Sequence, residues 1–163
     1  MEATKEELQR YEELQALALE FARQGKTHEL KAMLEAKMPV NLSDHKGNTL
    51  LMLASYNGHV QTTQMLIEMQ ASVDQKNDAG QTPLAGVCFK GYFDVVKVLV
   101  KAGANIDENN GLGTTPLFFA SMFGHEKIVR FLSEQRKNKG MQSKIYLLVS
   151  RFFALFRKKE KHN

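Results

Sequence analysis

The sequence contains very little cysteine and proline and no tryptophan. Its single cysteine, Cys88, excludes an intramolecular disulfide and any metal-binding motif that needs paired cysteines. Three prolines among 163 residues leave no proline-rich tract, and 25% charged with 43% hydrophobic residues is unlike the composition of disordered chains. We therefore expect one folded domain with a sizeable core.

Long apolar runs are also missing, and none approaches the roughly 20 residues that cross a bilayer. The start, MEATKEELQRYEELQALALEFAR, is acidic and amphipathic and lacks the basic and apolar regions of a secretory signal. Thr4 and Glu7 in this segment fit a capping box at the start of a helix. Together with the single cysteine, these features predict a protein of the reducing cytoplasm.

Motifs of common catalytic and metal sites are not found. The sequence has no H-E-x-x-H, G-x-S-x-G or phosphate-cradling G-x-x-x-x-G-K-[ST] segment. Asp44, Asp74, Asp78 and Asp107 stand in predicted turns, where local hydrogen bonding favours aspartate. We predict no enzyme, no catalytic residue and no metal site.

Acidic and basic residues are unevenly distributed along the chain. Residues 1–35 carry eight acidic and five basic side chains, a net charge of −3, whereas residues 136–163 carry one acidic and nine basic side chains, a net charge of +8. A basic tail suits contact with anionic lipid, nucleic acid or an acidic protein, and a solvated terminus explains it equally well.

The strongest pattern in the sequence is a period of 33 residues over three copies. Five positions keep this period: Gly47, Gly80 and Gly113; Thr49, Thr82 and Thr115; Leu51, Leu84 and Leu117; Gly58, Gly91 and Gly124; Leu66, Leu99 and Leu132. Such a period is typical of architectures in which one small structural unit is repeated.

Each copy predicts the same local structure. A polar, glycine-containing turn precedes a short apolar helix, in whose first turn Pro83 and Pro116 are tolerated. The second glycine of the copy ends that helix in the left-handed conformation, and a second helix follows. Its apolar residues, such as Val95, Val98 and Leu99, share one face. Two short helices cannot bury that face alone, so neighbouring copies must stack on each other.

These copies resemble ankyrin repeats. The family pattern G-x-T-P-L, then alanines, G-H, a V-V pair, L-L and G-A, is matched almost throughout by GQTPLAGVCFKGYFDVVKVLVKAGANID. The resemblance covers residues 44 to about 135 and extends weakly upstream, since Gly25 stands 33 residues before Gly58.

The resemblance implies an all-α ankyrin-repeat solenoid of helix-turn-helix repeats with short hairpin-like turns. The expected organisation is an N-terminal helix and degenerate capping repeat (1–43), three repeats (44–76, 77–109 and 110–138), and a basic amphipathic C-terminal helix and tail (139–163). Thr62 and Thr63 stand where the apolar V-V pair belongs. We therefore expect the interface of the first complete repeat to be the weaker one.

The resemblance also implies a partner-binding surface, because turn tips and exposed sides of the first helices line a concave groove in ankyrin repeats. The matching positions are His45, Lys46, Asn48, Tyr56, Asn57, Asp78, Ala79, Gln81, Phe89, Lys90, Gly111, Leu112, Thr114, Met122 and Phe123. Tyr56, Phe89 and Met122 form one column of large side chains, the types that act as binding hot spots. Alternatively, Tyr56 and Phe89 pack over neighbouring inner helices and serve only the fold.

Other residues take structural roles under the same resemblance. His59 and His125 follow the helix-ending glycines, where such histidines support the neighbouring loop, and Cys88 occupies a position inside the stack. One binding alternative involves haem, because Tyr56 near His45 or His59 could supply an axial ligand. Some compact bacterial ankyrin proteins assist haem enzymes such as catalase.

The segment KIYLLVSRFFALFRKK, residues 144–159, predicts an amphipathic helix that is not a fourth repeat in register. At about 100° per residue, one half of the helix carries Ile145, Tyr146, Leu148, Val149, Phe152, Phe153, Leu155 and Phe156, and the other carries Ser150, Arg151, Arg157 and Lys158. We expect it to cap the stack with its apolar half, leaving the polar half outside. Membrane or partner contact is the alternative for Phe152, Phe153, Phe156, Arg157, Lys158 and Lys159.

The function predicted from these features is a non-enzymatic, monomeric adaptor that binds a protein partner without a cofactor. The first alternative is a peripheral membrane module that uses the C-terminal helix on an anionic surface, and the second is a haem-binding or catalase accessory protein. Nucleic acid binding is disfavoured, because the aromatic residues of the tail share its apolar face and do not interleave with the basic ones.

Overall fold

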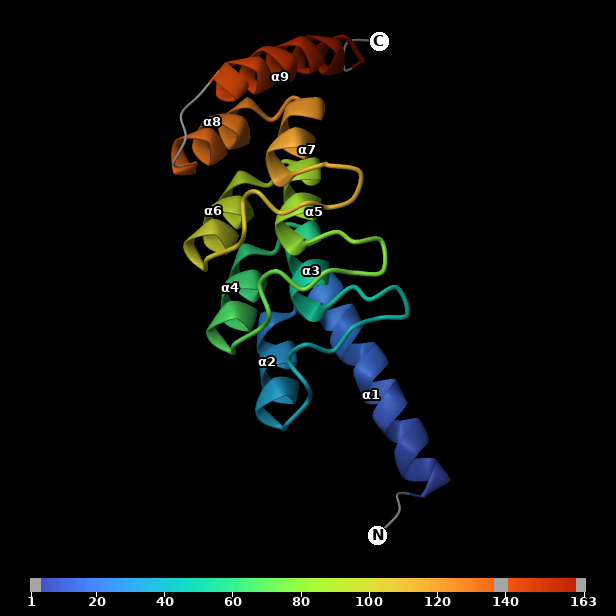
Figure 1. Ribbon diagram of the computed structural model, residues 1–163. Coiled ribbons are helices and arrows are strands. Elements are labelled where there is room, and N and C mark those ends of the chain that lie inside the picture. Colours follow the sequence, from blue (N-terminus) through green and yellow to red (C-terminus); the bar gives the residue numbers. More distant parts are fainter. Residues whose placement is uncertain (1–3, 137–140, 161–163) are drawn as a thin grey trace.

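The computed structural model describes residues 4–136 and 141–160, with side chains in the last helix over residues 144–155. Helices in these ranges form a stack of pairs (Figure 1). They are α1 (Lys5–Gln24), α2 (Thr27–Glu35), α3 (Leu50–Tyr56), α4 (Val60–Glu68), α5 (Pro83–Lys90), α6 (Phe93–Lys101), α7 (Pro116–Met122), α8 (Glu126–Gln135) and α9 (Met141–Glu160).

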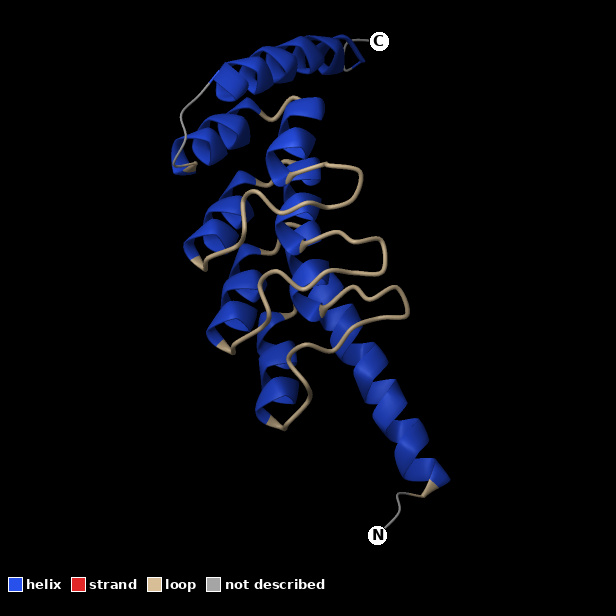
Figure 2. Cartoon of the chain, viewed as in Figure 1, coloured by secondary structure: helices blue, strands red, loops and turns tan. Residues whose placement is uncertain are grey.

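The helix pairs stack as two columns. In the inner column α1 contacts α3, α3 contacts α5 and α5 contacts α7; in the outer column α2, α4, α6 and α8 follow one another, and α9 lies over both α7 and α8. The long loops before α3, α5 and α7 project to one side of the inner column (Figure 2). The predicted all-α solenoid of repeated helix pairs is confirmed.

The repeating threonine starts the inner helices. Thr49, Thr82 and Thr115 are N-caps, and the hydroxyl of each accepts a hydrogen bond from the backbone N–H three residues on, at 3.2 to 3.3 Å. Pro83 and Pro116 occupy the first helical position, as predicted. The capping box predicted at the start of α1, between Thr4 and Glu7, is also present.

The repeating leucines fill the core between the columns. Leu51, Leu84 and Leu117 of the inner helices, and Leu66, Leu99 and Leu132 of the outer helices, are at most 1% exposed. Neighbouring pairs share these side chains in one contiguous cluster, so each pair completes the core of the pair before it.

A glycine after each inner helix leaves room for the next helix pair. Gly25, Gly58, Gly91 and Gly124 have positive φ angles of 70°, 82°, 86° and 68°. A ring of the next pair covers the first three: His59 lies over Gly25, Tyr92 over Gly58 and His125 over Gly91. A Cβ at Gly25 would lie 2.5 Å from Nδ1 of His59, so glycine is required there.

The two histidines also bond to the preceding repeat. Nε2 of His59 donates to the Arg23 carbonyl at 2.7 Å, and Nε2 of His125 donates to the Phe89 carbonyl at 3.0 Å. Both carbonyls belong to the last turn of an inner helix, where no further helical N–H is available. The structural role that the family resemblance implies for these histidines is confirmed.

Thr62 and Thr63 are buried, in the place of the apolar pair. The hydroxyl of Thr62 shares a 2.7 Å hydrogen bond with that of Thr27 on α2, and the hydroxyl of Thr63 donates to the His59 carbonyl at 2.8 Å. Burial therefore leaves neither hydroxyl unsatisfied. A weaker interface at this repeat stays a prediction.

Helix α9 caps the stack, but the predicted division of its faces is only partly right: Tyr146 packs on the core and Arg151 is exposed, as expected, whereas other residues are not where they were predicted. Ser150, assigned to the outer half, is fully buried, whereas Leu148 and Leu155 are 71% and 66% exposed. Phe152 is exposed and Phe153 half-buried. The side chains of Phe156, Arg157, Lys158 and Lys159, predicted for membrane or partner contact, lie outside the described residues.

Side-chain size as well as hydrophobicity explains the face that α9 turns inward, on which Tyr146 and Leu147 pack against the core. A Cβ at Gly124 would lie 2.8 Å from the backbone nitrogen of Ala154, so the two backbones approach closely. Ser150 and Ala154, one helical turn apart, are small enough to allow this approach. The buried hydroxyl of Ser150 has no hydrogen-bond partner among the described residues. Close packing is obtained at the cost of that unsatisfied group.

We predict that Gly124→Ala destabilises the protein more than Gly80→Ala. Both glycines have a positive φ, 68° and 75°, so either substitution costs about 1 to 2 kcal/mol in backbone strain. Only at Gly124 does the new Cβ meet backbone, whereas no atom lies within 4 Å at Gly80. Urea unfolding measures both variants. Equal losses would mean that α9 does not rest on Gly124.

Candidate functional site

The candidate site is the side of the stack formed by the three long loops and the exposed sides of α3, α5 and α7, called here the loop face (Figure 2). In each loop one backbone hydrogen bond joins the two sides of the turn, and this bond recurs every 33 residues. The donors are the N–H groups of Asp44, Asn77 and Asn110, and the acceptors are the carbonyls of Asn48, Gln81 and Thr114, at 3.0, 3.0 and 2.8 Å.

Side-chain carbonyl and carboxylate oxygens hold the loop tips. Oδ1 of Asp44 accepts from the N–H groups of Lys46 and Asn48, and Oδ1 of Asn77 accepts from those of Ala79 and Gln81. These hydrogen bonds satisfy backbone N–H groups that have no backbone acceptor in a tight turn. Asn77 was not among the predicted site residues, although its spacing of 33 from Asp44 could have indicated its role.

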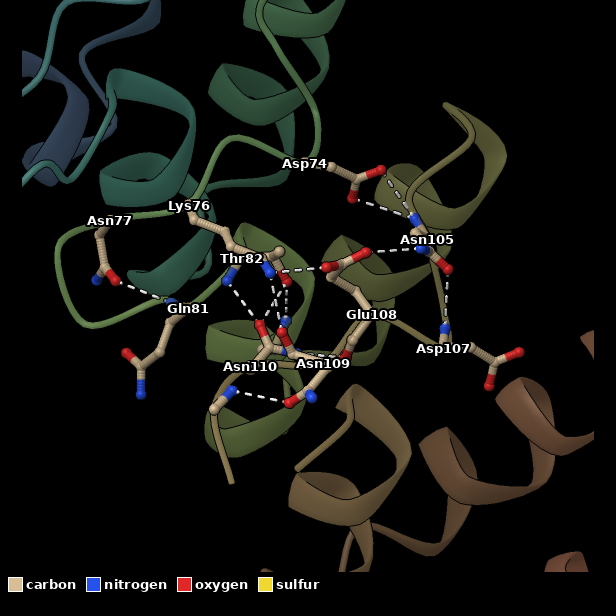
Figure 3. Close-up of polar contacts among 12 residues, drawn as sticks. Asp74, Lys76, Asn77, Gln81, Thr82, Asn105, Asp107, Glu108, Asn109 and Asn110 are labelled. Carbon is tan, nitrogen blue, oxygen red and sulfur yellow. Dashed lines mark hydrogen bonds and ion pairs between the residues drawn. The ribbon is translucent and has the colours of Figure 1, made fainter. Parts of the chain in front are cut away.

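Hydrogen bonds between consecutive repeats tie the loops to one another (Figure 3). Oδ1 of the buried Asn110 accepts from both the N–H and the hydroxyl of Thr82, at 2.8 and 3.0 Å. Nζ of Lys76 lies 2.7 Å from a carboxylate oxygen of Glu108. Nδ2 of Asn77 donates to Oδ1 of Asn48 at 2.9 Å. The loop face is therefore a connected platform.

Three aromatic rings, named here the ring ladder, run along this platform. Tyr56 and Phe89 are nearly parallel, with centroids 6.4 Å apart, and Phe123 meets Phe89 edge-on at 4.3 Å. Tyr56 is 40% and Phe89 37% exposed. Nζ of Lys90 lies 5.1 Å from the Tyr56 ring centroid, a cation–π distance. The rings therefore touch one another and still present surface to solvent.

A hollow of about 460 Å³ lies beside Tyr56, between the first two loops. Its walls include six of the predicted partner-binding residues, His45, Lys46, Asn48, Tyr56, Asn57 and Gln81. Arg23, Asp44, Asn77 and Thr82 complete its polar rim, and no sequence pattern pointed to Arg23. The structure thus brings residues of three helix pairs to one concavity.

The remaining predicted residues lie elsewhere on the loop face. Phe89 and Phe123 belong to the ring ladder, and Met122, which ends α7 and directly precedes Phe123, is exposed. The N–H of Asp78 donates to the Lys46 carbonyl at 3.0 Å, which joins two loop tips. Leu112 is fully exposed at the tip of the third loop.

Asp44 is the most strongly held charge at the hollow. Burial raises the pKa of its carboxyl, but hydrogen bonds from Asn48 and Lys46 together with the charge of Arg23, 3.3 Å away, outweigh burial and hold the pKa below the ordinary value. This carboxylate therefore stays ionised and fixes the first loop against α1.

Chemically reactive groups do not gather on the loop face. Cys88 is fully buried in α5, and burial raises the pKa of its thiol far above the usual range, which makes it a poor nucleophile. Among residues 4–136 and 141–160, no group of three histidine, cysteine or acidic side chains is placed to hold a metal ion.

Two residues of the haem hypothesis share the hollow. His45 and Tyr56 both line it, whereas His59 uses its Nε2 on the Arg23 carbonyl. Haem binding stays a prediction. In the described part of the chain, no helix is both long and apolar enough to cross a membrane.

Comparison with known proteins identifies the repeats. A family model described as ankyrin repeats (3 copies) matches residues 69–143, and one described as ankyrin repeats (many copies) matches residues 18–67. An ankyrin repeat protein of Pseudomonas aeruginosa is 48% identical over 46 residues, which are 28% of this chain and 27% of that protein. The match spans about a quarter of that relative's length.

The chain belongs to the ankyrin repeat family. Ankyrin repeats are generally protein–protein interaction modules, and members of the family are typically not enzymes. The architecture expected from the 33-residue period is therefore confirmed by the fold and by the family match.

Replacing Asp44 by asparagine should lower the free energy of unfolding at pH 7 by about 1 to 2 kcal/mol, because the charge-assisted hydrogen bonds are lost. A carboxyl with a depressed folded-state pKa stabilises the protein above its unfolded pKa of about 3.9, and this contribution is lost as the pH falls through the folded value. Urea unfolding at pH 7 and at low pH should therefore show the gap to wild type closing below about pH 3.9.

Asp78→Asn, at the exposed tip of the next loop, serves as the matched control, with an expected change within about 0.5 kcal/mol. A gap for Asp44→Asn that stays constant with pH would refute the role assigned to the ionised carboxylate.

Proposed function

We propose that the chain is a protein-binding adaptor that holds its partner on the loop face. The observation that carries this proposal is the ring ladder, in which Tyr56, Phe89 and Phe123 follow one another on a hydrogen-bonded platform and remain partly exposed. Aromatic side chains that are already ordered lose little further entropy on binding, so they are effective hot spots.

The hollow beside Tyr56 suggests the chemistry of the partner. Its rim carries the charges of Arg23, Asp44 and Lys46 around an apolar floor that includes Met52 and Leu53. A peptide or loop that inserts an apolar side chain and places polar groups on the rim fits this arrangement. We further propose a reducing, cytoplasmic setting, supported by the free thiol of Cys88.

The double variant Tyr56→Ala/Phe89→Ala tests the proposal. Both side chains are partly exposed, so we expect the free energy of unfolding to fall by no more than about 1 kcal/mol per ring. Partner capture should be lost, because the hot-spot rings are gone. The measurements are urea unfolding and affinity capture from the source cells with wild type and variant in parallel.

Phe131→Ala is the matched control. Its ring forms an edge-on pair with Phe93 on the outer column, with centroids 5.6 Å apart, and packs on the core. This variant should lose about 3 kcal/mol of stability and still capture the partner. The proposal is wrong if the double variant retains every captured protein, or if it loses as much stability as Phe131→Ala.

A further inference from the structure

The outer face of α9 is apolar along its centre and basic at its edge. Ile145, Leu148 and Leu155 are more than half exposed, and the exposed Lys144 and Arg151 flank them on the helix. Residues 141–160 contain five basic residues and one acidic residue. Nε of Arg151 lies 3.7 Å from a carboxylate oxygen of Glu126, but basic residues still outnumber acidic ones on α9, so this end of the stack presents apolar surface within a net positive field.

The opposite end of the stack presents apolar surface within a negative field. Helix α1 runs beyond the stack toward the N-terminus, at the far end from α9 (Figure 1). Its second half buries Ala18 in the core, and earlier turns of that same side carry Leu8, Tyr11 and Leu14, all more than 40% exposed. Residues 5–24 contain five glutamates against three basic residues.

We propose that the chain self-associates head to tail, with the projecting half of α1 of one copy lying along the outer face of α9 of the next. The two faces have opposite charge. The exposed residues Leu8 to Leu14 of α1 span about 9 Å and those from Ile145 to Leu155 of α9 about 15 Å, at 1.5 Å per residue, so the α1 stripe fits within the α9 stripe.

A single contact of this kind covers both exposed stripes. An anionic membrane on α9 would leave the α1 stripe in water, and a symmetric contact between two α9 helices would oppose like charges. The head-to-tail contact joins two different surfaces, so a dimer still has one free α1 face and one free α9 face. Further copies can therefore add as the concentration rises. Salt weakens it by screening the charges.

Two variants that each remove one face provide the test. The α1 variant is Leu8→Gln/Tyr11→Gln and the α9 variant is Leu148→Gln/Leu155→Gln; all four residues are exposed helix positions, and glutamine is a good helix former. Leu112→Gln, which removes a fully exposed loop leucine, is the control. Circular dichroism and urea unfolding establish that each variant folds, and sedimentation equilibrium gives the mass.

Wild type and Leu112→Gln should exceed the 18.5 kDa monomer mass as concentration rises, and added salt should reverse the increase. Each variant alone should be monomeric. An equimolar mixture of the two should reach twice the monomer mass and no more, because one intact α1 face and one intact α9 face remain.

Other outcomes overturn the proposal. Wild type that stays monomeric at high concentration and low salt excludes it, as does a mixture that stays monomeric. An α1 variant that dimerises alone assigns the contact to two α9 helices. Monomeric wild type that sediments with anionic vesicles, while the α9 variant does not, assigns the α9 face to lipid.

Discussion

The structure depends on one close approach that recurs at the end of every inner helix. There a glycine in the left-handed conformation lets the next element come within van der Waals contact of the backbone. His59 and His125 add a hydrogen bond to the carbonyls left open in the last helical turn. At Gly124 the ring is replaced by the backbone of α9, so the interaction that joins the repeats also ends the array.

This spacing is what makes the loop face usable for recognition. Because each helix pair sits at a fixed place on the one before it, the rings of Tyr56 and Phe89 lie nearly parallel, with their centroids 6.4 Å apart. The loops are joined by hydrogen bonds such as that from Thr82 to Asn110, so the rings and the hollow share one hydrogen-bonded platform. A partner then binds a surface that folding has already ordered, so little further conformational entropy is lost on binding.

Most of the fold and part of the site could be predicted from the period. Glycine, threonine and leucine recur because their roles are local, and the same local roles place Tyr56 and Phe89 on one face. The hollow was not predictable, because Arg23 joins it through the path of α1 and no repeat position marks it. The inward face of α9 was predicted only in part, for a different reason: a helical wheel weighs hydrophobicity, whereas the approach to Gly124 selects for the small side chains of Ser150 and Ala154.

The orientation of α9 therefore tests the account most directly, since both the cap and the exposed apolar stripe follow from it. Ser150→Cys and Leu148→Cys can be prepared separately in the wild-type chain, whose own Cys88 is fully buried. The rate of reaction with a thiol reagent reports exposure. We predict that the thiol at position 148 reacts as fast as that of an unfolded peptide, and that the thiol at position 150 reacts at about one tenth of that rate or below. Fast reaction at position 150 with protection at position 148 would contradict the account.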